Sequence, residues 1–166
     1  RIRLMKRAAR LIEERLFHIS AALTLEVGKN RMEAMGEVQE TADFFDIYAD
    51  DFEKHNAFEH ELPDDPIVGF RSRNRSVMRP HGVWVVIAPF NFPFALAGGP
   101  IAAAVVTGNA VVFKTATDTP WSGRMLADCL RYAGFPPGVF NYLNGSGRDV
   151  GQTLVDDPRP AGVTFT

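Results

Sequence analysis

The stretch that decides the fold is residues 82–114, GVWVVIAPFNFPFALAGGPIAAAVVTGNAVVFK. From Gly82 to Phe113 it contains no Asp, Glu, Lys, Arg or His, which favours burial of its strands and helix, in a membrane or in a protein core. A membrane helix needs about 20 unbroken apolar residues, whereas prolines and glycines interrupt this run repeatedly. We therefore expect burial inside a globular protein, with strands over 83–88 and 110–114 and an apolar helix from near 93 to 106. Strands without polar alternation are typical of a parallel sheet covered on both faces.

The same alternation of strand and helix continues to the end of the chain. Thr117, Asp118 and Thr119 offer polar caps before Pro120, so a helix begins there, and Gly134 ends it. We interpret Asp118 as the helix cap rather than a catalytic acid. Four strands joined by helices imply right-handed connections and therefore an open parallel sheet of the α/β class. The remaining predicted elements are strands over 139–143 and 161–166, a glycine-rich turn over 144–147 and a short helix over 148–155.

The amino-terminal part is predicted to be helical. Apolar residues recur at steps of three and four over 1–27 and again over 30–55, with Gly28 between the two helices. The short turn makes them an antiparallel pair that covers another layer. The acidic, proline-bearing stretch 59–66 is a connection into a basic strand over 67–79. These features divide the chain into a helical cover (1–66), a connecting strand (67–81) and a sheet domain (82–166).

The composition excludes several classes of function. With 18 Lys and Arg against 20 Asp and Glu, the net charge is -2 and the pI is near 6.1, so there is no general attraction for nucleic acid or an anionic membrane. The single cysteine excludes an intrachain disulfide and a cysteine zinc cage, and the four histidines lack ligand spacing, so we expect no metal site. A reducing cytoplasm is the expected compartment. The chain begins at Arg1 without an initiator Met and stops within an apolar run, so we expect it to be part of a longer protein.

Asn91 follows the first buried strand, at the edge where open parallel sheets bind ligands. It lies between two prolines in otherwise apolar surroundings. Its amide can donate to a developing oxyanion, which is worth about 3–4 kcal/mol in a site that excludes water. The alternative is that Asn91 only satisfies backbone groups where the next helix begins.

Lys114 is the first charge after the apolar run and ends the second strand. It can donate to ribose hydroxyls or pair with a 2′-phosphate, or it simply reaches water at the strand end. After the third strand, Gly145, Gly147 and Gly151 can let a ligand approach the backbone, although their spacing differs from the usual dinucleotide pattern.

Two other residues look reactive and are given structural interpretations. Cys129 shares an apolar helix face with Leu126, and buried apolar cysteines are poor thiolates, so we interpret it as packing. His81 stands between a proline and a glycine and is interpreted as a turn residue rather than a base.

Four blocks of the sequence together resemble the aldehyde dehydrogenase superfamily. They are GVWVVIAPFNFP (82–93), GNAVVFK (108–114), AGFPPGVFN (133–141) and VTFT (163–166). The helix-ending segment LEVGKN (25–30) also matches, so the resemblance covers nearly the whole chain. With residues 31–43 included, the sequence is most similar to the pyrroline-5-carboxylate (glutamate semialdehyde) dehydrogenase branch.

The resemblance implies a Rossmann-like sheet, with 82–166 as the first part of a truncated dinucleotide-binding domain. It also implies NAD- or NADP-dependent oxidation of an aldehyde to an acid, which in this branch is glutamate semialdehyde to glutamate. In this family a cysteine thiolate attacks the aldehyde, hydride passes to nicotinamide, and a glutamate activates the water that hydrolyses the thioester. Both residues lie beyond Thr166, so the chain alone is expected to be inactive. The aldehyde is the expected partner, and the longer protein is expected to be a homo-oligomer.

By the same resemblance, Asn91 is the catalytic oxyanion donor, and Lys114 meets the adenosine ribose. Thr117 stands where many family members carry a glutamate that binds the ribose and repels a 2′-phosphate. Without that carboxylate the site is expected to discriminate weakly between NAD and NADP. Gly147 and Gly151 lie near the adenine, and the end of the chain leads into the pyrophosphate helix. The expected cofactor-binding residues are Ile87, Ala88, Pro89, Phe90, Asn91, Lys114, Ala116, Thr117, Gly147, Gly151, Phe165 and Thr166.

Three other functions remain open. A relative of the same fold that makes acyl-CoA or reduces an acyl phosphate would share the strands and Asn91, and would differ only beyond Thr166. A non-catalytic module would instead oligomerise through the apolar surface of its half-sheet. A membrane-inserted segment is the third alternative.

Overall fold

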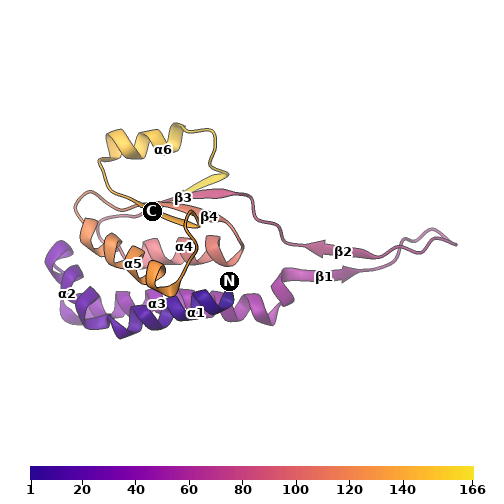
Figure 1. Ribbon diagram of the computed structural model, residues 1–166, viewed down its shortest axis with the longest axis horizontal. Helices are drawn as coiled ribbons and strands as arrows, with labels where there is room; N and C mark the ends of the chain where they lie inside the picture. Colours follow the sequence, from indigo (N-terminus) through magenta and orange to yellow (C-terminus); the bar gives the residue numbers. More distant parts are fainter.

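Four parallel strands form the sheet at the centre of the computed structural model, which covers residues 1–166 (Figure 1). They are β3 (Val83–Ile87), β4 (Ala110–Lys114), β5 (Phe140–Leu143) and β6 (Gly162–Phe165). Their order across the sheet is β5-β4-β3-β6, which is the 3-2-1-4 order of a dinucleotide-binding sheet. The prediction of an open parallel α/β sheet is confirmed, with each strand end within one residue of its predicted position.

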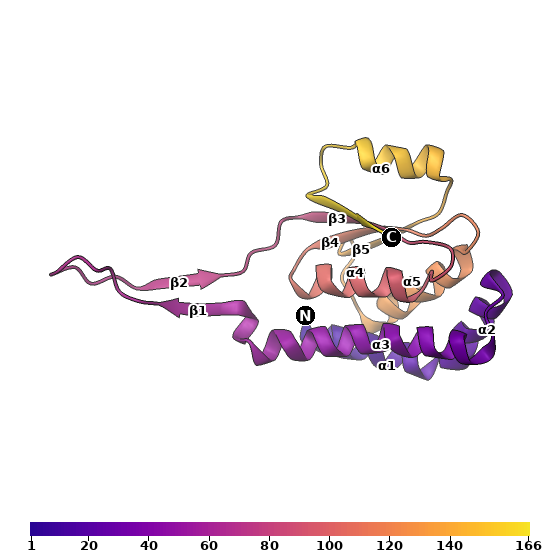
Figure 2. The same ribbon diagram turned by 180° about the vertical axis from the view of Figure 1, so that it is seen from behind.

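Helices cover both faces of this sheet, as the buried apolar strands require. Helices α4 (Ala95–Val106) and α5 (Pro120–Ala133) lie against one face. A π-helical turn (Gly147–Gly151) and α6 (Gln152–Asp156) lie over the other, at the top of both ribbon views (Figures 1 and 2). None of the helices has the length and hydrophobicity needed to cross a membrane.

The outer helical layer consists of α1 (Ile2–Glu14), α2 (Leu16–Val27) and α3 (Arg31–Lys54), which pack against α4 and α5 (Figure 2). Local chemistry sets two of their ends. Gly28 has a φ of 79°, a left-handed conformation that ends α2. Asn30 then begins α3, because its side chain accepts from the backbone of Met32 and Glu33 while Glu33 accepts from the backbone of Asn30.

One continuous hydrophobic core joins the outer helical layer, α4, α5 and the sheet. Close helix contacts depend on small residues. A Cβ on Gly98 of α4 would lie 2.4 Å from the Thr41 methyl carbon of α3, and a Cβ on Gly123 of α5 would lie 2.7 Å from the Thr115 hydroxyl oxygen. Both distances are shorter than van der Waals contact, so only glycine allows these helices to lie where they do.

Residues 1–27 form two helices rather than the single predicted helix. The break is at Arg15, whose φ of -104° and ψ of 11° leave the helical region, and whose guanidinium lies 4.9 Å from the centre of the Tyr132 ring on α5. The apolar spacing runs through the break without interruption, from Ile12 to Leu16 and Ile19. The sequence pattern therefore contains no sign of it.

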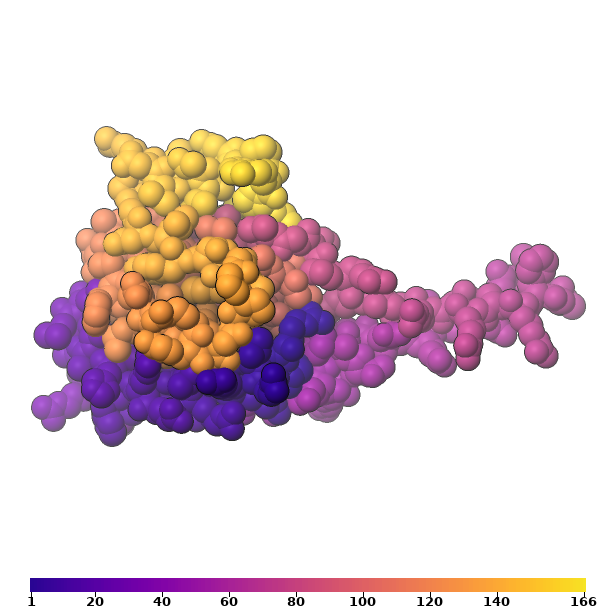
Figure 3. Space-filling view, in the orientation of Figure 1, coloured from indigo at the N-terminus to yellow at the C-terminus, as the bar shows by residue number.

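The connection and strand predicted between 59 and 79 are wrong in detail. Residues Glu59–Leu62, predicted as a connection, form strand β1, and the predicted strand over 67–79 is limited to β2 (Asn74–Val77). The two strands pair antiparallel in a hairpin that extends away from the rest of the molecule (Figure 3). Both faces of this hairpin are exposed to water, so charged residues pair across it, as Glu59 and Arg75 do at 2.6 Å, and the usual apolar strand signal is absent.

A buried ion pair attaches the outer helical layer to α4. The Glu37 side chain on α3 has no exposed surface, and one of its oxygens lies 2.5 Å from the Lys29 ammonium, whose side chain is 9% exposed. The other oxygen accepts from the backbone N–H groups of Phe94 and Ala95, at 2.8 and 3.1 Å, where α4 begins. These contacts provide the carboxylate with the cation and hydrogen-bond donors that a buried charge requires.

We expect Lys29→Met to lower the free energy of unfolding by about 3 kcal/mol, because it leaves Glu37 buried without a cation. Urea unfolding followed by circular dichroism measures the loss. Lys6→Met is the control, because Lys6 pairs with Asp50 and Glu53 in exposed positions and should leave stability close to that of the wild type. Equal losses in the two variants would contradict the assignment of Lys29 to a buried pair.

Candidate functional site

The parallel register aligns the ends of the four strands at one edge of the sheet. Ile87 of β3 is paired with Lys114 of β4 and with Phe165 of β6, and Lys114 is paired with Leu143 of β5. We call this edge, together with the turns that follow the strands, the carboxyl rim. Asn91 and Lys114 therefore belong to the same rim, as the sequence predicts.

The first rim turn, residues 88–94, carries Asn91. Its beginning is fixed where the Ala88 N–H donates to the Lys114 carbonyl at 3.1 Å, and its end is fixed where Phe94 donates to Glu37. Asn91 between these points is exposed, and Phe90 beside it is 62% exposed. The alternative role for Asn91, satisfying backbone groups at the start of the helix, is wrong because Glu37 accepts from those groups.

Lys114 is buried at the rim rather than extended into water. Its residue is only 3% exposed, and its ammonium donates to the Thr115 carbonyl at 2.9 Å. Burial lowers the pKa of this ammonium below its ordinary value. A Cβ on Gly151 would lie 3.6 Å from the Lys114 side chain, so two of the predicted cofactor residues are neighbours. An ammonium has three donors, and the Thr115 carbonyl uses one of them.

The second rim turn, residues 115–119, precedes α5 and carries Ala116 and Thr117. Ala116 is half-buried and Thr117 is exposed, with its hydroxyl 3.4 Å from the Gly145 carbonyl oxygen. This contact brings the turn next to the glycine-rich segment. The prediction that Asp118 caps α5 is wrong, because Thr119 is the N-cap and its side chain makes no capping hydrogen bond.

Glu26 of α2 caps α5 instead. Its two carboxylate oxygens accept from the backbone N–H groups of Trp121 and Ser122, at 2.7 and 2.8 Å, and from the Ser122 hydroxyl. Pro120 has no N–H, and Gly123 donates to the Thr119 carbonyl, so no backbone donor is left free at the start of this helix.

The glycine-rich segment and the end of the chain complete the rim. The Ser146 hydroxyl accepts from the Asp149 backbone at the start of the π-helical turn. A Cβ on Gly147 would meet nothing within 4 Å, so this glycine borders open space. Phe165 is 75% exposed, and Thr166 beside it is exposed as well.

The helix starts at the rim offer no open phosphate site. A phosphate at a helix start needs free backbone N–H groups, whereas carboxylates occupy the starts of α4 and α5 and Ser146 occupies the start of the π-helical turn. Uncharged or cationic donors and exposed aromatic rings remain. The Lys114 ammonium and the Asn91 amide are two such donors, and Phe90 is one such ring.

Glu26 and Glu37 are the residues that sequence reasoning missed. The signal for Glu37 is its position on α3, one helical turn from Ala34 and Thr41, both fully buried. A glutamate on the buried face of a helix requires a partner, and this rule could have found it. Glu26 carries the same signal, because Leu23 and Ala22, one helical turn before it on α2, are buried.

Cys129 and His81, interpreted from the sequence as structural rather than catalytic, have structural contacts. Cys129 is fully buried, with its sulfur 3.8 Å from the Leu11 carbonyl oxygen, and burial raises the pKa of its thiol to about 11. His81 lies in the turn before β3, where its backbone N–H and that of Gly82 donate to the Asn109 side chain at 2.7 and 3.0 Å. This contact is at the opposite edge of the sheet from the rim.

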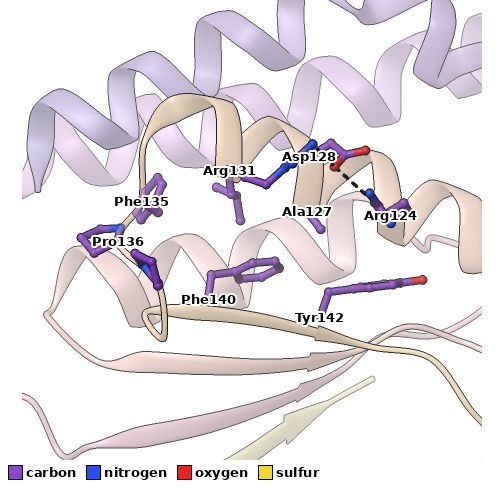
Figure 4. A pocket seen from close by; sticks show the side chains of 10 residues that line it. Arg124, Ala127, Asp128, Arg131, Phe135, Pro136, Phe140 and Tyr142 are labelled. Carbon is purple, nitrogen blue, oxygen red and sulfur yellow. Dashed lines mark hydrogen bonds and ion pairs between the residues drawn. The ribbon is translucent and has the colours of Figure 1, made fainter.

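Two surface cavities beside the sheet lie away from the rim residues. A groove of about 410 Å³ runs between α5 and β5, where Asp128 pairs with Arg124 at 3.2 Å above Phe140 and Tyr142 (Figure 4). A larger cavity of about 590 Å³ lies along α4 and includes Trp84. Neither is lined by any of the predicted cofactor residues.

A model of the aldehyde dehydrogenase family matches residues 1–166. The chain belongs to the aldehyde dehydrogenase family. Among curated relatives, the 1-pyrroline-5-carboxylate dehydrogenase of Anoxybacillus flavithermus is 41% identical over 160 residues, which cover 96% of this chain and 30% of that protein. The 1-pyrroline-5-carboxylate dehydrogenase 1 of Halalkalibacterium halodurans is 39% identical over 166 residues, which cover 100% of this chain and 31% of that protein. The chain thus spans about a third of the length of these relatives.

Solved structures of the family have the same arrangement. A structure of proline utilization A with proline bound in remote sites matches with a TM-score of 0.91 and 38% identity, over 99% of this chain and 16% of that chain. The NADP-dependent glyceraldehyde-3-phosphate dehydrogenase of Bacillus halodurans, solved with NADP, matches with a TM-score of 0.89 and 37% identity. The match covers 99% of this chain and 34% of that chain. The expected family and its Rossmann-like fold are both confirmed.

We expect the Cys129 thiol to react very slowly with an aromatic disulfide reagent while the protein is folded. A thiol pKa of about 11 instead of 9.0 lowers the thiolate fraction at neutral pH about a hundredfold, and burial blocks access as well. Absorbance of the released thiol measures the rate, with the urea-unfolded protein as the control. Labelling of the folded protein at the unfolded rate would contradict the assignment of Cys129 to packing.

Proposed function

We propose that this chain is part of an NAD(P)-dependent aldehyde dehydrogenase that oxidises glutamate semialdehyde, the open form of pyrroline-5-carboxylate, to glutamate. The family match over the whole chain supports the reaction class. The names of the curated relatives support the substrate and a place in proline catabolism. The observation that carries the proposal is the position of Asn91 and Lys114 on one carboxyl rim of a 3-2-1-4 parallel sheet.

Each rim residue has a role in this proposal. The exposed Asn91 amide donates to the oxygen of the aldehyde as negative charge develops on it. Lys114 uses its remaining donors on the hydroxyls of the adenosine ribose, with Ala116 and Thr117 alongside. The nicotinamide cofactor supplies the hydride acceptor. The residues proposed to line its cleft are Ile87, Ala88, Pro89, Phe90, Gly147, Gly151, Phe165 and Thr166.

We propose that the site accepts NADP as well as NAD. Thr117 is neutral and exposed, and Lys114 has no carboxylate within hydrogen-bond distance. A 2′-phosphate on the ribose would therefore meet an ammonium without meeting a like charge. The pyrophosphate needs backbone donors that the capped starts of α4 and α5 do not offer, so it binds after β6.

The thioester step requires a nucleophile that this chain does not provide. Its single thiol, Cys129, is fully buried and has a raised pKa. The chain alone is therefore proposed not to oxidise an aldehyde, and to bind the cofactor only weakly because the pyrophosphate site is proposed to lie after β6. In the longer protein, the projecting hairpin is the proposed contact for homo-oligomer formation, because it exposes 99% of Val68 and 70% of Phe70.

Nuclear magnetic resonance titration of the chain with NAD and NADP tests the proposed site. We expect both cofactors to shift the backbone amides of the two rim turns and of Gly147 and Gly151. Lys114→Met keeps the side-chain volume and removes the donors, so it should weaken binding about tenfold. Lys6→Met is the exposed control. Shifts confined to other surfaces, or equal binding by Lys114→Met and the wild type, would contradict the proposal.

Mixing the chain with pyrroline-5-carboxylate and NAD tests the separation of cofactor binding from chemistry. We expect no formation of reduced nicotinamide by absorbance, because no activated thiol is present. A 1-pyrroline-5-carboxylate dehydrogenase assayed in parallel is the positive control. Turnover that persists in Cys129→Ser would mean that the chemistry has been assigned to the wrong residues.

A further inference from the structure

The starts of both helices that follow the rim turns are held by carboxylates from the outer helical layer. Glu37 on α3 accepts from the first N–H groups of α4, and Glu26 on α2 accepts from those of α5. Figure 1 shows α2 and α3 on the far side of α4 and α5 from the sheet. Neither glutamate is close in sequence to the helix that it caps, so each connects two layers of the fold.

Glu37 and Lys29 act together on the first rim turn. Asn91 lies between Ala88, whose N–H donates to a β4 carbonyl, and Phe94, whose N–H donates to the Glu37 carboxylate. The turn is therefore fixed at both ends. The Lys29 ammonium, which pairs with Glu37, also lies 3.4 Å from the centre of the Phe92 ring. The residue next to Asn91 is therefore held by the same ion pair.

Glu26 acts in the same way on the second rim turn. This turn follows Lys114 and ends at Thr119, where the Thr119 carbonyl accepts from the Thr115 hydroxyl at 2.8 Å. Glu26 then holds the next two N–H groups of α5 and the Ser122 hydroxyl. The position of Thr117 relative to Lys114 depends on where this helix begins.

We propose that Glu37, with Lys29, and Glu26 are positioning residues for the cofactor and the substrate oxygen. Glu37 sets the position of the Asn91 turn at the nicotinamide end. Glu26 sets the position of the Thr117 turn at the ribose end. This inference rests on the proposed function, because it assigns these two ends of the cofactor to the two turns.

The two caps have a second effect, on where the phosphates of the cofactor can bind. Phosphate binds readily to an open helix start, and both α4 and α5 begin at the rim. A carboxylate at each start uses the N–H groups that a phosphate would need. Glu26 also repels a second anion, whereas the charge of Glu37 is offset by Lys29.

The experiment compares Glu37→Ala and Glu26→Ala with Glu40→Ala, a control on the exposed side of α3. Amide hydrogen exchange, measured for each residue without cofactor, reports how well each turn is held in its conformation. We expect Glu37→Ala to speed exchange in residues 88–94 but not in 115–119, and Glu26→Ala to do the reverse. Exchange that rises equally in both turns would mean only general destabilisation and would overturn the proposal.

Binding is then measured by titration with NAD and with AMP, which carries only the adenosine half. We expect Glu37→Ala to weaken NAD binding about tenfold and leave AMP binding unchanged, whereas Glu26→Ala weakens both. Glu37→Gln keeps an oxygen acceptor for Phe94 and Ala95, so it should restore most of the NAD affinity. If Glu37→Ala does not fold, Glu37→Gln and Lys29→Met replace it in the exchange and binding measurements. We then expect smaller increases in exchange, confined to residues 88–94, and smaller losses of NAD affinity.

Ile12→Ala is the stability-matched control, because Ile12 is fully buried in α1 away from the rim. It should lower stability and leave both affinities unchanged. Equal affinities in Glu37→Ala and the wild type, with both proteins folded, would overturn the positioning role. Failure of the wild type to bind NAD or AMP would overturn the proposed function instead, while the exchange pattern would still decide whether the glutamates order their turns.

Discussion

The Glu37 carboxylate lies wholly inside the protein and can be stable there only with a cation and hydrogen-bond donors around it. Lys29 provides the cation, and the first N–H groups of α4 provide the donors. These partners come from two separate segments of the chain, the turn before α3 and the start of α4. They must therefore come together for any of them to be satisfied, and this requirement fixes the outer helical layer against the helix that follows the central strand β3.

Contacts of the same kind join the outer helical layer to the rest of the fold at other points. Glu26 holds the start of α5 as Glu37 holds the start of α4. At the other end of α4, the Arg1 guanidinium donates to the Val106 carbonyl at 3.1 Å and lies 5.0 Å from the centre of the Phe52 ring. Polar contacts with strict geometry thus connect the layers at both ends, while the apolar core fills the space between them.

The closed helix starts also explain how this sheet differs from other dinucleotide-binding sheets with the same strand order. The usual site for pyrophosphate is a glycine-rich turn after the first strand, at an open helix start. Here the turn after β3 contains two prolines and no glycine, and a carboxylate occupies the helix start. In the proposed function this turn presents a side chain, Asn91, to the reacting group, and the phosphates are bound elsewhere.

The sequence by itself determined the parallel sheet, the bounds of its strands and the residues on its carboxyl rim, because these depend on local apolar runs and on prolines and glycines. Only the tertiary structure decided which groups cap α4 and α5, since Glu37 and Phe94 are 57 residues apart and no local rule pairs them. The same limit applies to the break at Arg15 and to the pairing of β1 with β2, where spacing and composition suggested other structures. A buried charge selects its partners in three dimensions, and a linear pattern can show only that it needs some.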